Sequence, residues 1–259
     1  AALIPSTNPT STVLYKSIIS LKAGNAIVIS PHPNAKKSIL RTVEIVKDAA
    51  RRAGAPENLV QCITIPSMEG TSALLKDRRI GIILAAGGEA MVRAAYSSGN
   101  PALGVGPGNG PAFIEKSANI PLAVKRIFDS KTFDNGTICA SEQSVVVERC
   151  SKDAVMAELT RQGGYFMNAE ESEKVSKFIL RANGTMNPAI VGKSAARIAD
   201  MAGISIPAGT RVLISEQTTV GKKNPYSREK LCPILAFYVE DDWHAACERC
   251  IEILNNEGV

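Results

Sequence analysis

Aromatic residues and histidines are scarce in this chain. Aromatics make up 5% of the sequence, 2 histidines are present, and the formal net charge is a mild +5. Proteins that bind nucleic acid carry a concentrated basic surface, often with aromatic side chains on which bases stack. The basic residues here are spread along predicted helices, so we expect no nucleic-acid partner.

Long apolar runs are also missing. No stretch approaches the roughly 20 apolar residues that a membrane helix needs, and residues 1–5 lack the charged start and long apolar core of a signal peptide. The 6 cysteines show no disulfide-framework spacing, and the Cys247-x-x-Cys250 pair has no second pair of ligands, so we expect no metal site. These absences predict a cytoplasmic protein with free thiols and no membrane contact.

The first 110 residues alternate regularly between apolar strands and helical patterns. Strands separated by helices predict a parallel sheet with right-handed crossovers, and continuously apolar strands predict that helices cover both sheet faces. We therefore expect a doubly wound α/β domain, which binds ligands at the carboxyl ends of its strands. The predicted strands are 26–30, 59–65, 80–85 and 102–105, and the predicted helices are 11–23, 35–53, 69–76 and 89–97.

The second half repeats the alternation less regularly. Its predicted strands lie near 112–114, 144–147, 211–215 and 234–239, and its predicted helices near 119–129, 152–161, 169–181, 195–202 and 242–255. A glycine-rich run over 104–110 suggests a domain boundary. This run is no dinucleotide fingerprint, because its glycines alternate and no helix follows at once.

The segment 131–143 is polar and rich in turn residues. Asp134-Asn135-Gly136 predicts a tight bend, and the β-branched run 144–148 predicts a buried strand after it. Cys139 would thus lie in a loop held by a rigid strand, where catalytic nucleophiles are commonly placed. A small apolar residue packed at a strand start is the alternative, and local features leave both open.

The chain resembles the CoA-acylating aldehyde dehydrogenases in separated motifs that keep the family's order. The family includes acetaldehyde and propionaldehyde dehydrogenases that form acyl-CoA, and the aldehyde half of bifunctional aldehyde–alcohol dehydrogenases. The resemblance covers essentially the whole chain and implies an aldehyde dehydrogenase fold, with an NAD-binding domain over 1–108 and a catalytic domain over 109–259. Family members are longer on both sides, so we expect each domain to lack a part. The matching motifs are IPSTNP (4–9), GNAIVISPHP (24–33), AYSSGNPALGVGPGN (95–109), KTFDNGTICASEQ (131–143), NGTMNP (183–188) and EKLCP (229–233).

The resemblance assigns roles to three polar side chains. Cys139 would be the nucleophile that forms a thioester with the substrate. The side-chain amide of Asn8, together with the backbone N–H of Cys139, would form an oxyanion hole for the alkoxide. Glu229 would accept hydrogen bonds from the nicotinamide ribose hydroxyls. Without the family, an Asn-Pro turn and an exposed glutamate are equally reasonable interpretations of Asn8 and Glu229.

The remaining candidate residues concern the cofactor. Ser30 and Pro31 end a predicted strand where other aldehyde dehydrogenases often carry a lysine that contacts the adenosine ribose, and the serine leaves NAD versus NADP open. Gly87 and Gly88 close a strand and open a helix, so their backbone amides could face a cofactor phosphate. A plain turn is an equally good interpretation of this glycine pair.

The resemblance also bears on the acyl acceptor. Hydrolytic aldehyde dehydrogenases place a glutamate general base where this chain has Val105. A CoA thiolate attacks thioesters without strong help, so Val105 favours CoA over water. We expect acetaldehyde as substrate, with propionaldehyde or sulfoacetaldehyde as alternatives. A homo-oligomer, fusion to an alcohol dehydrogenase domain and packaging in a bacterial microcompartment are further expectations. A hydrolytic enzyme or a catalytically silent domain remain alternatives.

Overall fold

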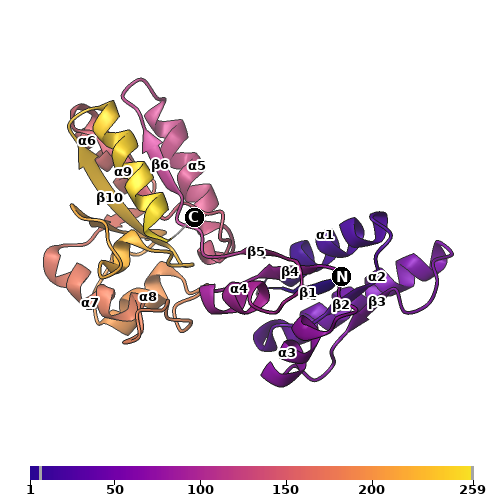
Figure 1. Cartoon of the computed structure of the whole chain (residues 1–259). Coiled ribbons are helices and arrows are strands. Elements are labelled where there is room, and N and C mark those ends of the chain that lie inside the picture. The colour runs from indigo at the N-terminus through magenta and orange to yellow at the C-terminus, as the bar shows by residue number, and fades with distance from the viewer. Residues whose placement is uncertain (6–7, 258–259) are drawn as a thin grey trace. The chain divides into compact units, whose positions relative to one another are not determined.

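A computed structural model describes residues 1–5 and 8–257. The chain divides into two compact units, Ala1–Pro107 and Gly108–Val259, and each is an α/β domain (Figure 1). The division falls inside the glycine-rich run, with Gly108 in the second unit.

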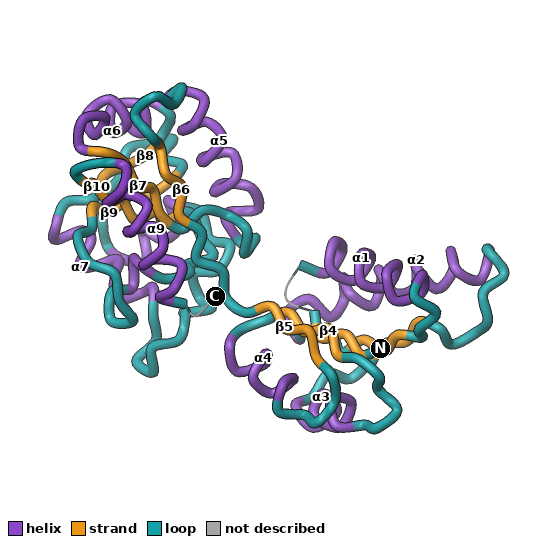
Figure 2. The backbone as a smooth tube through the Cα atoms, turned by 45° about the horizontal axis from the view of Figure 1, so that its top comes forward, coloured by secondary structure: helices purple, strands orange, loops and turns teal. Residues whose placement is uncertain are grey.

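The first unit is a parallel sheet of five strands in the order β3-β2-β1-β4-β5. Helices α1 and α2 cover one face and α3 and α4 the other (Figure 2). The described elements are β1 Ala2–Ile4, α1 Pro9–Lys22, β2 Ile27–Ile29, the short 3-10 helix Pro33–Ala35, α2 Lys36–Arg52, β3 Val60–Cys62, α3 Met68–Lys76, β4 Ile83–Ala86, α4 Glu89–Tyr96 and β5 Ala102–Val105.

Alternation along β1 supplies the core on both faces of this sheet. Leu3 packs with Ile39 and Val43 of α2, whereas Ala2 and Ile4 face the cluster of α3 and α4 that contains Leu75. Residues two apart in a strand share a face, so a strand that is apolar at every position can serve two helix layers. Each large side chain buried in this way contributes about 1.5–3 kcal/mol.

The second unit is also a parallel sheet of five strands, in the order β6-β7-β10-β9-β8. Helices α5 and α6 pack on one face, and α7, α8 and α9 pack on the other. The described elements are β6 Pro111–Ile114, α5 Ile120–Thr132, β7 Ser144–Glu148, α6 Lys152–Arg161, β8 Gly164–Phe166, α7 Ala169–Ile179, α8 Ala195–Ala202, β9 Val212–Glu216, β10 Ile234–Glu240 and α9 Trp243–Asn256, with 3-10 helices at Phe133–Gly136, Arg149–Ser151 and Pro225–Ser227.

The predicted α/β class with parallel sheets is confirmed in both units. Two strands lie outside the predicted ranges: β1 Ala2–Ile4, and β8, which pairs with β9 from Gly164 onward. Glycine is needed at this point because a Cβ would lie 2.8 Å from both the Ile214 side chain and the Leu159 carbonyl oxygen. The predicted strand 59–65 is shorter than expected, since β3 ends at Cys62.

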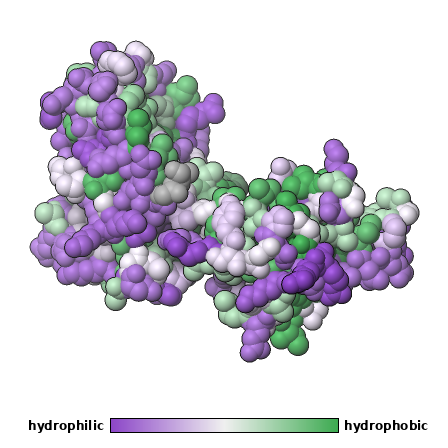
Figure 3. Space-filling model, in the orientation of Figure 1, coloured by the Kyte–Doolittle hydropathy of each residue, from purple (hydrophilic) through white to green (hydrophobic). Residues whose placement is uncertain are grey.

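Among the described residues, none of the helices is both long and apolar enough to cross a bilayer. Hydrophobic side chains gather over α1 in Figure 3, where Tyr15 and Ile18 are exposed. All 6 cysteines are free.

Candidate active site

The loop that carries Cys139 begins at the carboxyl end of α5. Asp134, Asn135 and Gly136 adopt left-handed backbone conformations with φ of 49°, 50° and 75°, which confirms the predicted bend. Glycine is required at 136 because a Cβ would lie 2.9 Å from the Lys131 carbonyl oxygen. The chain then turns through Cys139, whose side chain is exposed, and enters β7.

Gly108 lies directly against the backbone of Cys139. A Cβ on Gly108 would be 2.5 Å from the Cys139 carbonyl oxygen, a separation that only a glycine permits. The N–H of Gly108 donates to Oε1 of Glu229 at 3.0 Å. One glycine therefore joins the predicted nucleophile loop to the predicted ribose-binding carboxylate.

Glu229 is 9% exposed. Burial raises the pKa of its carboxyl to about 7, although the Gly108 N–H and the nearby Lys131 and Lys230 oppose this shift. The backbone N–H of Glu229 donates to Oε1 of Glu257 at 3.2 Å. The alternative of an exposed loop glutamate is therefore wrong, because the side chain is buried.

These residues gather at the amino-terminal edge of the second sheet. Gly108 precedes β6, Cys139 precedes β7 and Glu229 precedes β10, and these three strands are neighbours. The expectation that ligands meet the carboxyl ends of strands therefore does not extend to this unit. The three segments come together because parallel neighbouring strands start at one edge.

Buried lysines behind the Cys139 loop were not foreseen. Lys131 and Lys230 are 0% exposed, as is Gln143. In the sequence, Lys131 opens the polar segment 131–143, and no local feature marks it as buried, since lysine is rarely fully buried. In the structure, Nζ of Lys131 and the backbone N–H of Lys230 both donate to the same oxygen of Gln143, so the Lys230 segment lies close to this lysine.

The first unit brings the other candidates to the carboxyl edge of its sheet. Asn8 follows β1, Ser30 and Pro31 follow β2, and Gly87 and Gly88 follow β4. These strands are adjacent in the order β2-β1-β4, so their ends share one edge, as the doubly wound fold requires of a nucleotide site.

The residues at this edge differ in how accessible their polar groups would be to a cofactor. The Ser30 hydroxyl is buried and lies 2.7 Å from the Thr71 hydroxyl oxygen, so only its backbone could meet a cofactor. Gly87 donates its N–H to the Val105 carbonyl at 3.3 Å. Gly88 begins α4, and a Cβ there would meet no described atom within 4 Å. Asn8 is half-buried and stands at the N-cap position of α1, but its side chain makes no capping hydrogen bond to a described N–H of that helix.

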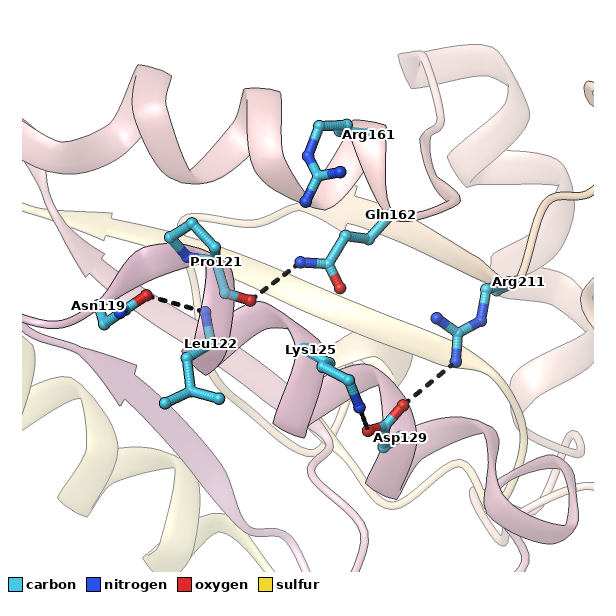
Figure 4. Close-up of a pocket in the computed structure, with 8 residues that line it drawn as sticks. All are labelled: Asn119, Pro121, Leu122, Lys125, Asp129, Arg161, Gln162 and Arg211. Atoms are coloured by element: carbon cyan, nitrogen blue, oxygen red, sulfur yellow. Dashed lines mark hydrogen bonds and ion pairs between the residues drawn. The ribbon is translucent and has the colours of Figure 1, made fainter.

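A surface hollow of about 550 Å³ lies between α5 and the end of α6 (Figure 4). Its polar groups already pair with one another: Lys125 and Arg211 both approach Asp129, and Gln162 donates to the Pro121 carbonyl at 3.0 Å. None of the predicted site residues lines it. No group of three metal-ligating side chains occurs among residues 1–5 and 8–257.

Comparison with known proteins identifies the family. Residues 1–246 match the aldehyde dehydrogenase family. The chain is 48% identical to the aldehyde-alcohol dehydrogenase of Clostridium acetobutylicum over all of its own length, which is 30% of that protein. It is 52% identical to an acetylating aldehyde dehydrogenase from Geobacillus thermoglucosidasius, with a TM-score of 0.95 over 100% of this chain and 57% of that one.

A third relative was solved with a ligand. The propionaldehyde dehydrogenase of Rhodopseudomonas palustris, with bound propionyl-CoA, is 32% identical, with a TM-score of 0.89 over 98% of this chain and 56% of that one. The chain thus spans between 30% and 57% of the length of these relatives. The predicted resemblance is confirmed, and the chain belongs to the aldehyde dehydrogenase family.

Proposed function

We propose that this chain supplies the cofactor-binding and nucleophilic parts of a CoA-acylating aldehyde dehydrogenase, which converts an aldehyde, NAD and CoA into acyl-CoA and NADH. One observation carries the proposal: the exposed thiol of Cys139 sits on a loop locked against Gly108, which in turn holds the buried carboxyl of Glu229. An accessible thiol beside a fixed carboxylate suits covalent catalysis with a hydroxylated cofactor.

The protein's part in the reaction is to form and release a thioester. The Cys139 thiolate attacks the aldehyde carbon, a C–S bond forms, and the carbonyl electron pair becomes an alkoxide. A bound nicotinamide would supply the hydride acceptor, and collapse of the alkoxide would then leave an acyl group on Cys139. Attack by a CoA thiolate then forms the acyl-CoA bond and returns the Cys139 thiolate. In this scheme Asn8 would donate to the alkoxide, which remains a prediction.

The residues present fit a dinucleotide. Gly88 offers open space at the start of α4, at the carboxyl edge of a doubly wound sheet, and a helix start favours an anionic phosphate. Ser30 and Pro31 flank the same edge, and Glu229 would accept the ribose hydroxyls in its carboxylate form. NADP remains an alternative, because Ser30 gives no charge with which to choose between the two cofactors.

CoA is the proposed acyl acceptor. Val105 ends β5 and is 56% exposed, so the position that carries a general base in hydrolytic relatives holds an apolar side chain here. The propionyl-CoA in the Rhodopseudomonas structure and the acetylating activity named for the Geobacillus relative support this choice. At neutral pH, a thiol acceptor depends less on a general base than water does, because its thiolate form attacks thioesters directly.

A hydrolytic reaction is the second candidate, favoured by one observation. The pKa of Glu229 is raised to about 7 by burial, which is the range of a general base at neutral pH. Were Glu229 to activate water against the thioester, the product would be the free acid. The dependence of turnover on CoA separates the two reactions.

Several finer properties stay proposals. We propose acetaldehyde as the substrate, with propionaldehyde and sulfoacetaldehyde as alternatives, and a homo-oligomeric enzyme in the cytoplasm. The name of the Clostridium relative supports fusion to an alcohol dehydrogenase domain. Enclosure in a bacterial microcompartment also remains a prediction.

The test is NADH formation by the intact protein with acetaldehyde, measured with and without CoA. We expect absorbance to rise only with CoA, and equal rates without it would instead support hydrolysis. Cys139→Ala should abolish turnover. Cys150→Ala is the matched control, because Cys150 is also a free and exposed thiol, and it should keep wild-type rates. Retained turnover in Cys139→Ala would overturn the proposal.

A further inference from the structure

Two lysines are fully buried beneath the Cys139 loop and share one acceptor. Nζ of Lys131 donates to Oε1 of Gln143 at 3.2 Å, and the backbone N–H of Lys230 donates to the same oxygen at 3.0 Å. Nζ of Lys230 donates to the carbonyls of Tyr226 and Arg228, each at 2.7 Å. Burying an ammonium group is costly unless it is paired, so an apolar residue at 131 would be the cheaper way to fill this space.

The bond between Lys131 and Gln143 closes the nucleophile loop. The two residues stand at the start and the end of the segment 131–143 that presents Cys139. Gln143 is itself fixed, because its N–H donates to the Gly110 carbonyl at 2.8 Å and its carbonyl accepts from Ala236 at 3.2 Å. Lys131 therefore ties the end of α5 to the start of β7 across the loop.

The same ammonium group acts on the carboxyl of Glu229. Charged and titratable groups face this cluster from several segments: Lys131 from α5, Glu142 from the loop, Lys230 and Cys232 from the segment before β10, and Glu257 after α9. Lys131 and Lys230 lower the pKa of Glu229, whereas burial and Glu257 raise it. Burial lowers the pKa of Lys131 to about 8, so this lysine remains mostly protonated at pH 7.

We propose that Lys131 is a positioning residue of the aldehyde reaction, which fixes the Cys139 loop through its hydrogen bond to Gln143 and favours the ionised form of Glu229 at the nicotinamide ribose. The inference rests on the proposed function, because it assigns Glu229 to the ribose. It explains why a buried cation is retained where it stabilises the fold little: the ammonium group joins the two ends of the loop, and it lowers the fraction of Glu229 that is protonated.

The first test measures NADH affinity of the intact protein by fluorescence titration between pH 6 and 9. In Lys131→Met we expect the dissociation constant at pH 7 to rise about tenfold through the lost charge interaction. The difference should close toward pH 9, where Glu229 is ionised in both proteins. Lys125→Met removes a 62% exposed lysine from the same helix and should leave the profile unchanged. A purely structural defect would weaken binding equally at every pH.

Gln143→Met provides the second test, because it removes the acceptor and keeps both lysines. We expect kcat to fall at least tenfold through displacement of the loop, while NADH affinity changes less than threefold. If Lys131→Met fails to fold, the kcat of Gln143→Met decides whether the inference holds.

Two results would overturn the inference: a Lys131→Met profile equal to that of Lys125→Met, or wild-type kcat in Gln143→Met. Wild-type protein that binds no NADH would instead refute the proposed function.

Discussion

A methyl group added at Gly108 should disable the site through a single contact. In Gly108→Ala the new Cβ would lie 2.5 Å from the Cys139 carbonyl oxygen, whereas real contacts of a Cβ are about 3.0 Å or longer. The two segments must therefore separate by about 0.5 Å or more. Because the Gly108 N–H also holds Glu229 at 3.0 Å, the movement disturbs both predicted functional groups.

The magnitudes follow from overpacking and misplacement. Overpacking of this kind costs about 1–3 kcal/mol of unfolding free energy, which urea titration would measure. A displacement approaching 1 Å at a reacting group can cost about 100-fold in rate. We expect kcat/KM of Gly108→Ala to fall by about 30- to 100-fold, with CoA and acetaldehyde as substrates.

Gly110→Ala is the matched control in the same glycine-rich run. A Cβ at Gly110 would meet no described atom within 4 Å, and the backbone there is not left-handed. This variant should keep its stability within about 0.5 kcal/mol of wild type, with near-normal activity. Equal activity in Gly108→Ala and Gly110→Ala would show that the contact with Cys139 does not position the nucleophile.

Two further outcomes follow from the same geometry. Gly88→Ala should fold normally and weaken NADH binding about tenfold or more, because its Cβ enters the space left for a phosphate. Gly81→Ala, with equal space at the opposite end of β4, should bind as wild type, and equal affinities in the two would contradict the phosphate assignment. For Glu229, burial raises the pKa of the folded-state carboxyl from its ordinary 4.5 to about 7, so this group makes the unfolding free energy fall by about 2 kcal/mol as pH rises from 5 to 7. Glu229→Gln should remove this slope, and an unchanged slope in urea titrations at pH 5 and 7 would refute the assigned pKa.

The architecture could largely be predicted from the sequence, because most of its helices and strands have recognisable local patterns of apolar and polar residues. Short continuous apolar runs predict buried strands, and apolar residues three to four positions apart predict amphipathic helices. The bend at Asp134-Asn135-Gly136 consists of residues that favour turns. β8 was not predicted because the three residues that begin at Gly164 are too few to show a hydrophobic periodicity. They form a strand because they pair with β9.

The site was only partly predictable. Motifs of the family pointed to Cys139 and Glu229, but not to the support beneath them. Lys131 and Gln143 are buried by segments distant in sequence, and Lys230 lies 87 positions from the glutamine whose side chain its N–H meets. Such contacts depend on which strands are neighbours in the sheet, and single-sequence patterns do not contain that information.

The most direct test of the central claim is to look for an acyl group on Cys139. The intact protein would be incubated with acetaldehyde and NAD without CoA, digested, and the peptide containing 131–143 analysed by mass spectrometry. The account predicts an acetyl group on Cys139 that disappears on addition of CoA, with acetyl-CoA formed in equal amount. An unmodified Cys139 during NADH formation, or an acyl group that water removes as fast as CoA does, would contradict it.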